Sequence, residues 1–133
     1  MRISYWFAAA AVVALVFGLG FMLLTEQVMS IYGVKTDAPG MLAARLFGTA
    51  LVGIGVLQWF ARDVEDTQAR RAIILGLFVL NALGFVVVLL AQFAGTVNGL
   101  GWINVAIYLI LTLGYAYFLQ SQFAQKPMET NAQ

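Results

Sequence analysis

The chain has 133 residues, of which 62% are hydrophobic and only 10% are charged, and its mean hydropathy is +0.91. Because a soluble globular domain carries about 25% charged residues, this composition excludes soluble, disordered and nucleic-acid-binding proteins and indicates a membrane protein. The net charge of +1 gives no reason to expect a polyanionic partner, and the absence of cysteine and histidine excludes disulfides, a Ser-His-Asp triad and the usual zinc sites.

Four apolar runs predict four membrane-spanning helices, at residues 5–24, 41–61, 72–95 and 102–120. Each run is close to the ~20 residues that cross a bilayer as a helix. The runs are too long for the strands of a membrane barrel, and they lack the alternation of apolar and polar residues that such strands show. The sequence therefore predicts an all-α membrane protein, with one up-and-down four-helix domain over residues 1–121. Residues 122–133 are predicted to form a polar, disordered tail.

The first run is followed by the longest connection of the chain, residues 25–40. The run exceeds the apolar region of a signal peptide and no A-x-A motif follows it, so we predict a retained membrane helix. In the connection, the apolar residues from Val28 to Tyr32 follow the polar Thr25-Glu26-Gln27, a pattern typical of a short helix at the membrane surface. Asp37 is the predicted N-cap of the second spanning helix, with Pro39 in its first turn.

The second connection, residues 62–71, is short and charged, and Asp66 or Thr67 is the predicted cap of the third spanning helix. The third connection, residues 96–101, is uncharged and contains Asn98. One side of the predicted membrane topology holds most of the basic residues, namely Arg2, Arg62, Arg70, Arg71 and Lys126, and the other side holds Lys35 and Arg45. The positive-inside rule then places both termini in the cytoplasm.

Small residues recur at helical spacing within the runs. The candidate packing positions are Ala10, Ala14 and Gly18 in the first run, Ala44, Gly48 and Gly53 in the second, and Gly76 and Gly84 in the third. Such residues let helix backbones approach closely, and close packing drives helix association in lipid. We interpret them as contacts within the bundle. The alternative is that one stripe contacts another copy of the chain or another protein.

Arg45 stands about one turn inside the second predicted helix, where a cation is costly unless it reaches water or a partner. Glu26, just past the first helix, is the predicted partner. Gln92 and Asn104 are expected at the same membrane level, so Glu26, Arg45, Gln92 and Asn104 form the one candidate polar cluster. The cluster is interpreted either as a structural tie between helices or as an outer-leaflet site for an anionic headgroup.

No catalytic centre is predicted. The remaining acid or base candidates are Glu26, Lys35, Asp37 and the tyrosines, and no two carboxylates share a helix face inside the bilayer. A proton-coupled transporter is disfavoured for the same reason. We therefore expect no enzyme, no cofactor and no metal site.

Several glycine- and aromatic-rich segments resemble a known group of proteins. These segments are Val16-Phe17-Gly18-Leu19-Gly20-Phe21, Ile31-Tyr32-Gly33-Val34 with Asp37 and Gly40, Ala44-Arg45-Leu46-Phe47-Gly48 with Gly53-Ile54-Gly55, and Gly101-Trp102 with Leu113-Gly114-Tyr115-Ala116-Tyr117-Phe118. They are similar to a widespread group of uncharacterised small bacterial four-helix integral membrane proteins. The resemblance implies this architecture and a bacterial cytoplasmic membrane, and it includes Arg45, but it carries no assigned activity.

The first function hypothesis is a non-enzymatic membrane protein that acts through helix contacts, as an accessory or assembly subunit of a membrane complex or as a homo-oligomer. The alternative is a binder or carrier of a lipid-like small molecule that uses the polar cluster around Arg45. A lipid-modifying enzyme is the third hypothesis. The lipid bilayer is the expected environment of all three, and nucleic acid is not an expected partner.

Overall fold

The computed structural model describes the backbone of residues 2–65 and 67–131, with side chains described as far as Gln122. Within these residues the fold is helical without strands, and its elements are α1 (Ile3–Leu23), α2 (Thr25–Ile31), α3 (Ala38–Ala61), α4 (Gln68–Phe93) and α5 (Gly101–Asn131). Four of them, α1, α3, α4 and the first part of α5, are long and apolar enough to cross a membrane. The predicted all-helical fold with four long apolar helices is thereby confirmed for the described residues.

The helix starts follow the predicted capping residues. The Asp37 carboxylate accepts a hydrogen bond from the Gly40 N–H at 3.0 Å and so begins α3, with proline in the first turn. The Thr67 hydroxyl accepts one from the Arg70 N–H at 3.4 Å and begins α4. Both predicted caps are confirmed, whereas the other candidate, Asp66, lies outside the described residues. At the other end of the chain, α5 runs as helix through Asn131, into the predicted tail 122–133, whose last two residues also lie outside the described part.

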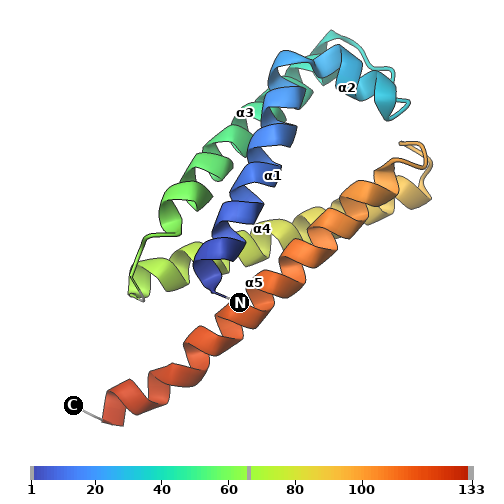
Figure 1. Ribbon diagram of the computed structural model, residues 1–133. Coiled ribbons are helices and arrows are strands. Elements are labelled where there is room, and N and C mark those ends of the chain that lie inside the picture. Colours follow the sequence, from blue (N-terminus) through green and yellow to red (C-terminus); the bar gives the residue numbers. More distant parts are fainter. Residues whose placement is uncertain (1, 66, 132–133) are drawn as a thin grey trace.

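The four long helices form two hairpins, α1 with α3 and α4 with α5 (Figure 1). The hairpins meet near the start of α1 and separate toward the opposite end. At that opposite end α2 leaves α1 and extends toward the connection between α4 and α5. The two hairpins therefore touch at both ends, through a core at one end and through α2 at the other.

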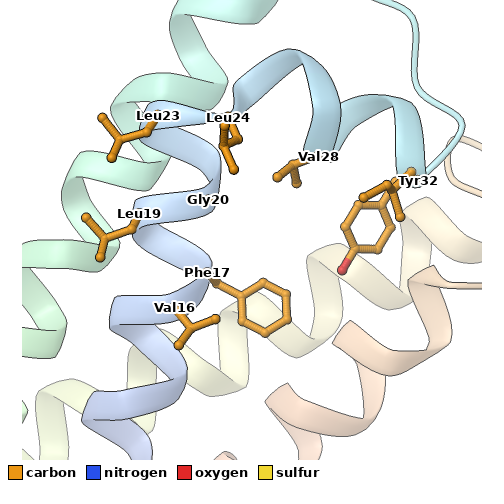
Figure 2. A pocket seen from close by; sticks show the side chains of 9 residues that line it. Val16, Phe17, Leu19, Gly20, Leu23, Leu24, Val28 and Tyr32 are labelled. Atoms are coloured by element: carbon orange, nitrogen blue, oxygen red, sulfur yellow. The ribbon is translucent and has the colours of Figure 1, made fainter.

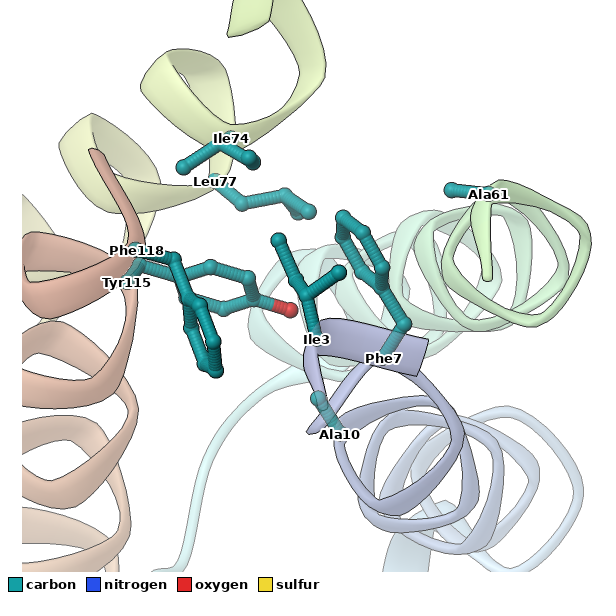
Figure 3. Packing of buried hydrophobic residues seen from close by; sticks show 8 residues of the cluster. All are labelled: Ile3, Phe7, Ala10, Ala61, Ile74, Leu77, Tyr115 and Phe118. Atoms are coloured by element: carbon teal, nitrogen blue, oxygen red, sulfur yellow. The ribbon is translucent and has the colours of Figure 1, made fainter. Parts of the chain in front are cut away.

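The core lies where the hairpins converge, and all four long helices contribute to it. Its members are Ile3, Phe7 and Ala10 of α1, Ala61 of α3, Ile74 and Leu77 of α4, and Tyr115 and Phe118 of α5. Figure 3 shows the Phe7 and Tyr115 side chains near the centre of this cluster, and both are 0% exposed. A buried hydrogen bond of 2.8 Å, from the Gln58 amide to the Tyr115 hydroxyl, also joins α3 to α5. This cluster is the main contact between the two hairpins.

Helices α1 and α3 cross at two glycines, Gly18 and Gly48, without intervening side chains. A Cβ on Gly48 would lie 2.7 Å from the Gly18 carbonyl oxygen, and a Cβ on Gly18 would lie 2.9 Å from the Gly48 carbonyl oxygen. Ala10 and Ala14 are buried along the same side of α1. The backbones thus approach closely enough for dispersion contacts between main-chain atoms, which favour helix association in lipid.

The other candidate packing residues differ in their surroundings. Gly84 lies against the Tyr108 ring and Ala44 is half-buried, whereas a Cβ on Gly53 or Gly76 would meet nothing within 4 Å. Other glycines of the spanning helices also make close contacts, among them Gly55 against Leu15 and Gly114 against Trp6. Spacing alone therefore does not separate packed glycines from glycines that face outward, because every face of these helices is apolar.

Candidate ligand-binding pocket

An open apolar pocket of about 680 Å³ lies between α1 and α2. It is lined by Val16, Phe17, Leu19, Gly20, Leu23, Leu24, Val28, Ile31 and Tyr32, and we call it the α1–α2 pocket. Figure 2 shows the Phe17 and Tyr32 rings directed into the space beneath α2. The Tyr32 hydroxyl is the one polar side-chain group among these lining residues. The size lies within the range of small-molecule sites, about 300–1,000 Å³.

The pocket owes its shape to the break between α1 and α2. Leu24 leaves the helical region with φ −118° and ψ 42°, so that α2 turns away from the α1 axis. The hydroxyl of Thr25 donates to the Phe21 carbonyl at 2.5 Å and satisfies a backbone acceptor that the end of α1 exposes. Gly20 lies below α2, where a Cβ would meet the Val28 side chain at an ordinary 3.5 Å. Because glycine has no side chain, the space between Gly20 and α2 remains part of the pocket.

Asn98, in the connection between α4 and α5, holds the far end of α2. Its side-chain amide donates to the Ile31 carbonyl at 2.8 Å, and its backbone N–H donates to the Tyr32 carbonyl at 3.0 Å. The Tyr32 hydroxyl donates to the Asn104 side chain of α5 at 3.1 Å. Gly33 follows with φ +74°, a left-handed conformation that suits glycine, directly over the Asn98 side chain. We call these contacts the α2 latch.

Replacing Asn98 with alanine tests the α2 latch. The variant loses the hydrogen bond to Ile31, which is worth about 1 kcal/mol, and also the one that the Asn98 side chain accepts from the Leu100 N–H within the connection. Loss of the Ile31 bond should make local opening of α2 about fivefold more frequent. Hydrogen–deuterium exchange of residues 28–34 in detergent micelles measures this opening. Thr96→Ala is the matched control in the same connection, because the Thr96 side chain donates to no described residue. Equal exchange in the two variants would contradict the latch.

The four residues of the predicted polar cluster do not bond to one another. Arg45 donates from Nε to the Thr25 hydroxyl at 3.4 Å, and no ion pair joins it to Glu26, although both residues are described. Gln92 donates to the Asn98 carbonyl at 3.1 Å, and Asn104 accepts from Tyr32. The predicted cluster is therefore not one site. Arg45 lies at the start of α2, whereas Gln92 and Asn104 bind residues of the α2 latch.

The predicted Glu26–Arg45 pair is absent for a geometric reason. Thr25, the first residue of α2, is 3% exposed and lies within reach of Arg45 on α3. Successive residues of a helix point about 100° apart, so Glu26 is directed away from Arg45 and is exposed. The sequence places Tyr32 and Asn98 in two separate connections and gives them no role as partners. Their pairing joins segments more than 60 residues apart, which no local pattern reveals.

The α1–α2 pocket offers apolar contact rather than acid–base chemistry. Within the described residues, no group of three acidic side chains is close enough to hold a metal ion. The arrangement suits a hydrophobic ligand held by shape. Comparison of the chain with protein-family models, with curated proteins and with solved structures finds no match.

Proposed function

We propose that this chain is a multi-pass membrane protein that binds a lipid-like molecule in the α1–α2 pocket. The carrying observation is the pocket itself, which is open, almost wholly apolar and formed largely by the membrane-spanning helix α1. Five of its aliphatic lining residues are exposed on the surface of the molecule: Val16, Leu19, Leu23, Leu24 and Ile31. In a bilayer the molecules that meet such a surface are acyl or isoprenoid chains. The proposed action is therefore to bind or carry such a molecule.

The proposed setting is a bacterial cytoplasmic membrane, with the four helices in up-and-down order and both termini in the cytoplasm. The distribution of lysine and arginine supports this orientation, because the connection 62–71 carries three arginines and the connection 96–101 carries none. In this orientation α2 and the α1–α2 pocket belong to the outer leaflet.

Gly20→Leu tests the proposed function by filling the pocket. The added side chain projects into the space beneath α2, and a Cβ at this position meets only an ordinary contact with Val28. We expect the amount of phospholipid that remains bound after gentle detergent extraction to fall about tenfold, which corresponds to ~1.4 kcal/mol. Native mass spectrometry of the purified protein measures the bound lipid.

Gly53→Leu is the matched control. It adds the same side chain to a membrane-spanning helix at a glycine whose Cβ would meet nothing within 4 Å, away from the pocket. The control should keep the lipid occupancy of the wild type. Equal lipid retention by wild type and Gly20→Leu, or a wild-type protein that retains no lipid, would count against the proposed function.

An accessory or assembly role is the second candidate function. Exposed apolar side chains recur every three or four residues along α4, at Leu75, Val79, Leu83, Val86 and Leu90, and form a continuous stripe. Such a stripe fits the surface of a neighbouring membrane helix as well as it fits lipid. A stoichiometric protein partner in the same extraction, lost when Leu83 is replaced by asparagine, would favour this function.

A further inference from the structure

Tyr32 belongs both to the α1–α2 pocket and to the α2 latch. It is one of the lining residues, and Figure 2 shows its ring and the Phe17 ring directed into the same space beneath α2. Its hydroxyl donates to the Asn104 side chain of α5 at 3.1 Å. None of the described residues that line the pocket comes from α4 or α5. One wall of the pocket is therefore attached to a hairpin that does not itself line the pocket.

The main chain around Tyr32 is attached to the same hairpin. The Asn98 side chain donates to the Ile31 carbonyl at 2.8 Å, and the Asn98 N–H donates to the Tyr32 carbonyl at 3.0 Å. Asn98 is itself held, because the Gln92 side chain of α4 donates to its carbonyl at 3.1 Å. With the main chain fixed in this way, the Tyr32 ring would still be free to rotate about its side-chain bonds. The hydrogen bond to Asn104 fixes the far end of the ring.

A ring that is already in place favours the binding of an apolar ligand. Besides Tyr32, the pocket offers aliphatic side chains, the Phe17 ring and a glycine, so a ligand is held by surface contact with these walls. An aromatic ring supplies a large part of such a surface from one position. When a ligand has to order a side chain, its affinity falls about fivefold, which corresponds to ~1 kcal/mol. Because the Tyr32 ring is bonded to Asn104, the ligand does not have to order it.

We propose that Asn104 is a positioning residue of the α1–α2 pocket, where it holds the Tyr32 ring as a wall and so strengthens the binding of lipid. This inference rests on the proposed function. It adds that the hairpin of α4 and α5 controls the affinity of a pocket formed by α1 and α2. Asn104 acts through Tyr32 and is not itself one of the lining residues.

A double-mutant cycle tests the inference. Purified protein in micelles is titrated with dioleoyl phosphatidylethanolamine, and native mass spectrometry gives the dissociation constant. Tyr32→Phe keeps the ring and removes the hydroxyl, whereas Asn104→Leu keeps the size of the side chain and removes the acceptor. We expect each variant to raise the dissociation constant about fivefold. The double variant should bind no more weakly than either single variant, because both changes remove the same hydrogen bond.

Two further variants show whether the hydrogen bond itself is responsible. Tyr117→Phe is the matched control, since it removes the hydroxyl of an exposed tyrosine of α5 that does not line the pocket. It should keep the dissociation constant of the wild type. Asn104→Asp restores an oxygen that accepts a hydrogen bond from the Tyr32 hydroxyl. Its dissociation constant should therefore return to that of the wild type, which a role of Asn104 in helix packing alone would not predict.

The possible results separate the inference from the proposed function. If Tyr32→Phe still weakens binding about fivefold when Asn104 is already leucine, the hydroxyl acts independently of Asn104 and the positioning role is overturned. Wild-type affinity in Asn104→Leu, or equally weak binding by Asn104→Asp and Asn104→Leu, would overturn it too. In each of these cases the pocket stands as long as Gly20→Leu lowers lipid binding. Failure of Gly20→Leu to do so would instead remove the pocket and with it the proposed function.

Discussion

Gly48→Leu should separate α1 from α3 and lower the free energy of unfolding by about 3 kcal/mol. A Cβ at this position would lie 2.5 Å from the Met22 backbone nitrogen and 2.7 Å from the Gly18 carbonyl oxygen. These are main-chain atoms of a regular helix, so they cannot rotate away as the end of a side chain can. The two helices must therefore move apart, and the contacts along their whole crossing weaken together. Unfolding in mixed micelles of a mild detergent and dodecyl sulfate, followed by circular dichroism, measures the change.

The control for this substitution lies on the same helix. Gly53→Leu adds an identical side chain where a Cβ would meet nothing within 4 Å, and an exposed position of this kind changes stability by about 0.5 kcal/mol or less. A large loss in both variants would mean that leucine disturbs α3 itself. A loss below about 1 kcal/mol in Gly48→Leu would contradict the close backbone crossing.

The sequence predicts the helices of this protein well and their partners poorly. Length and hydropathy identify four apolar helices, and the side-chain chemistry of Asp37 and Thr67 identifies two of their starts. Both the hydropathy and the capping side chains can be recognised from residues that are close together in the sequence. The pairing of α1 with α3 and of α4 with α5 depends instead on which apolar face meets which, and these helices are apolar all round. Glycine spacing points to Gly18 and Gly48, but it points equally to Gly53, which meets nothing.

The candidate site shows the same division between local and long-range information. Arg45 was identified because a charge inside an apolar run is conspicuous. Its partner was not, because the break at Leu24 decides that Thr25 rather than Glu26 faces α3. The pocket could not be predicted from the sequence, because its lining residues are of the same aliphatic types as those on the outer faces of the helices.

The two contacts between the hairpins have different strengths. The core at the convergent end buries aromatic side chains completely, whereas the α2 latch consists of a few hydrogen bonds among partly exposed residues. Opening should therefore occur first at the latch, where each bond contributes about 1 kcal/mol. The core holds the hairpins together while this happens.

Tyr115→Ala should be the most destabilising substitution in that core, with a loss of about 3–5 kcal/mol. The Tyr115 side chain is 0% exposed, and its ring centroid lies 6.0 Å from those of Trp6 and Phe7. Its removal leaves a cavity between the hairpins and deprives the Gln58 amide of the acceptor at 2.8 Å. Tyr117→Ala, on an exposed face of the same helix, should cost about 1 kcal/mol or less.

A second pair of variants separates packing from hydrogen bonding at Tyr115. Tyr115→Phe keeps the ring and removes only the hydroxyl, so it should cost about 1–2 kcal/mol, the price of a buried amide donor without an acceptor. Adding Gln58→Leu removes that orphaned donor, and the double variant should recover most of the loss because both partners are then apolar. Unfolding in mixed micelles measures each step. If the double variant is less stable than Tyr115→Phe alone, the hydrogen bond is not what joins α3 to α5, and the contacts of the Tyr115 ring with Trp6 and Phe7 of α1 must hold the hairpins together there.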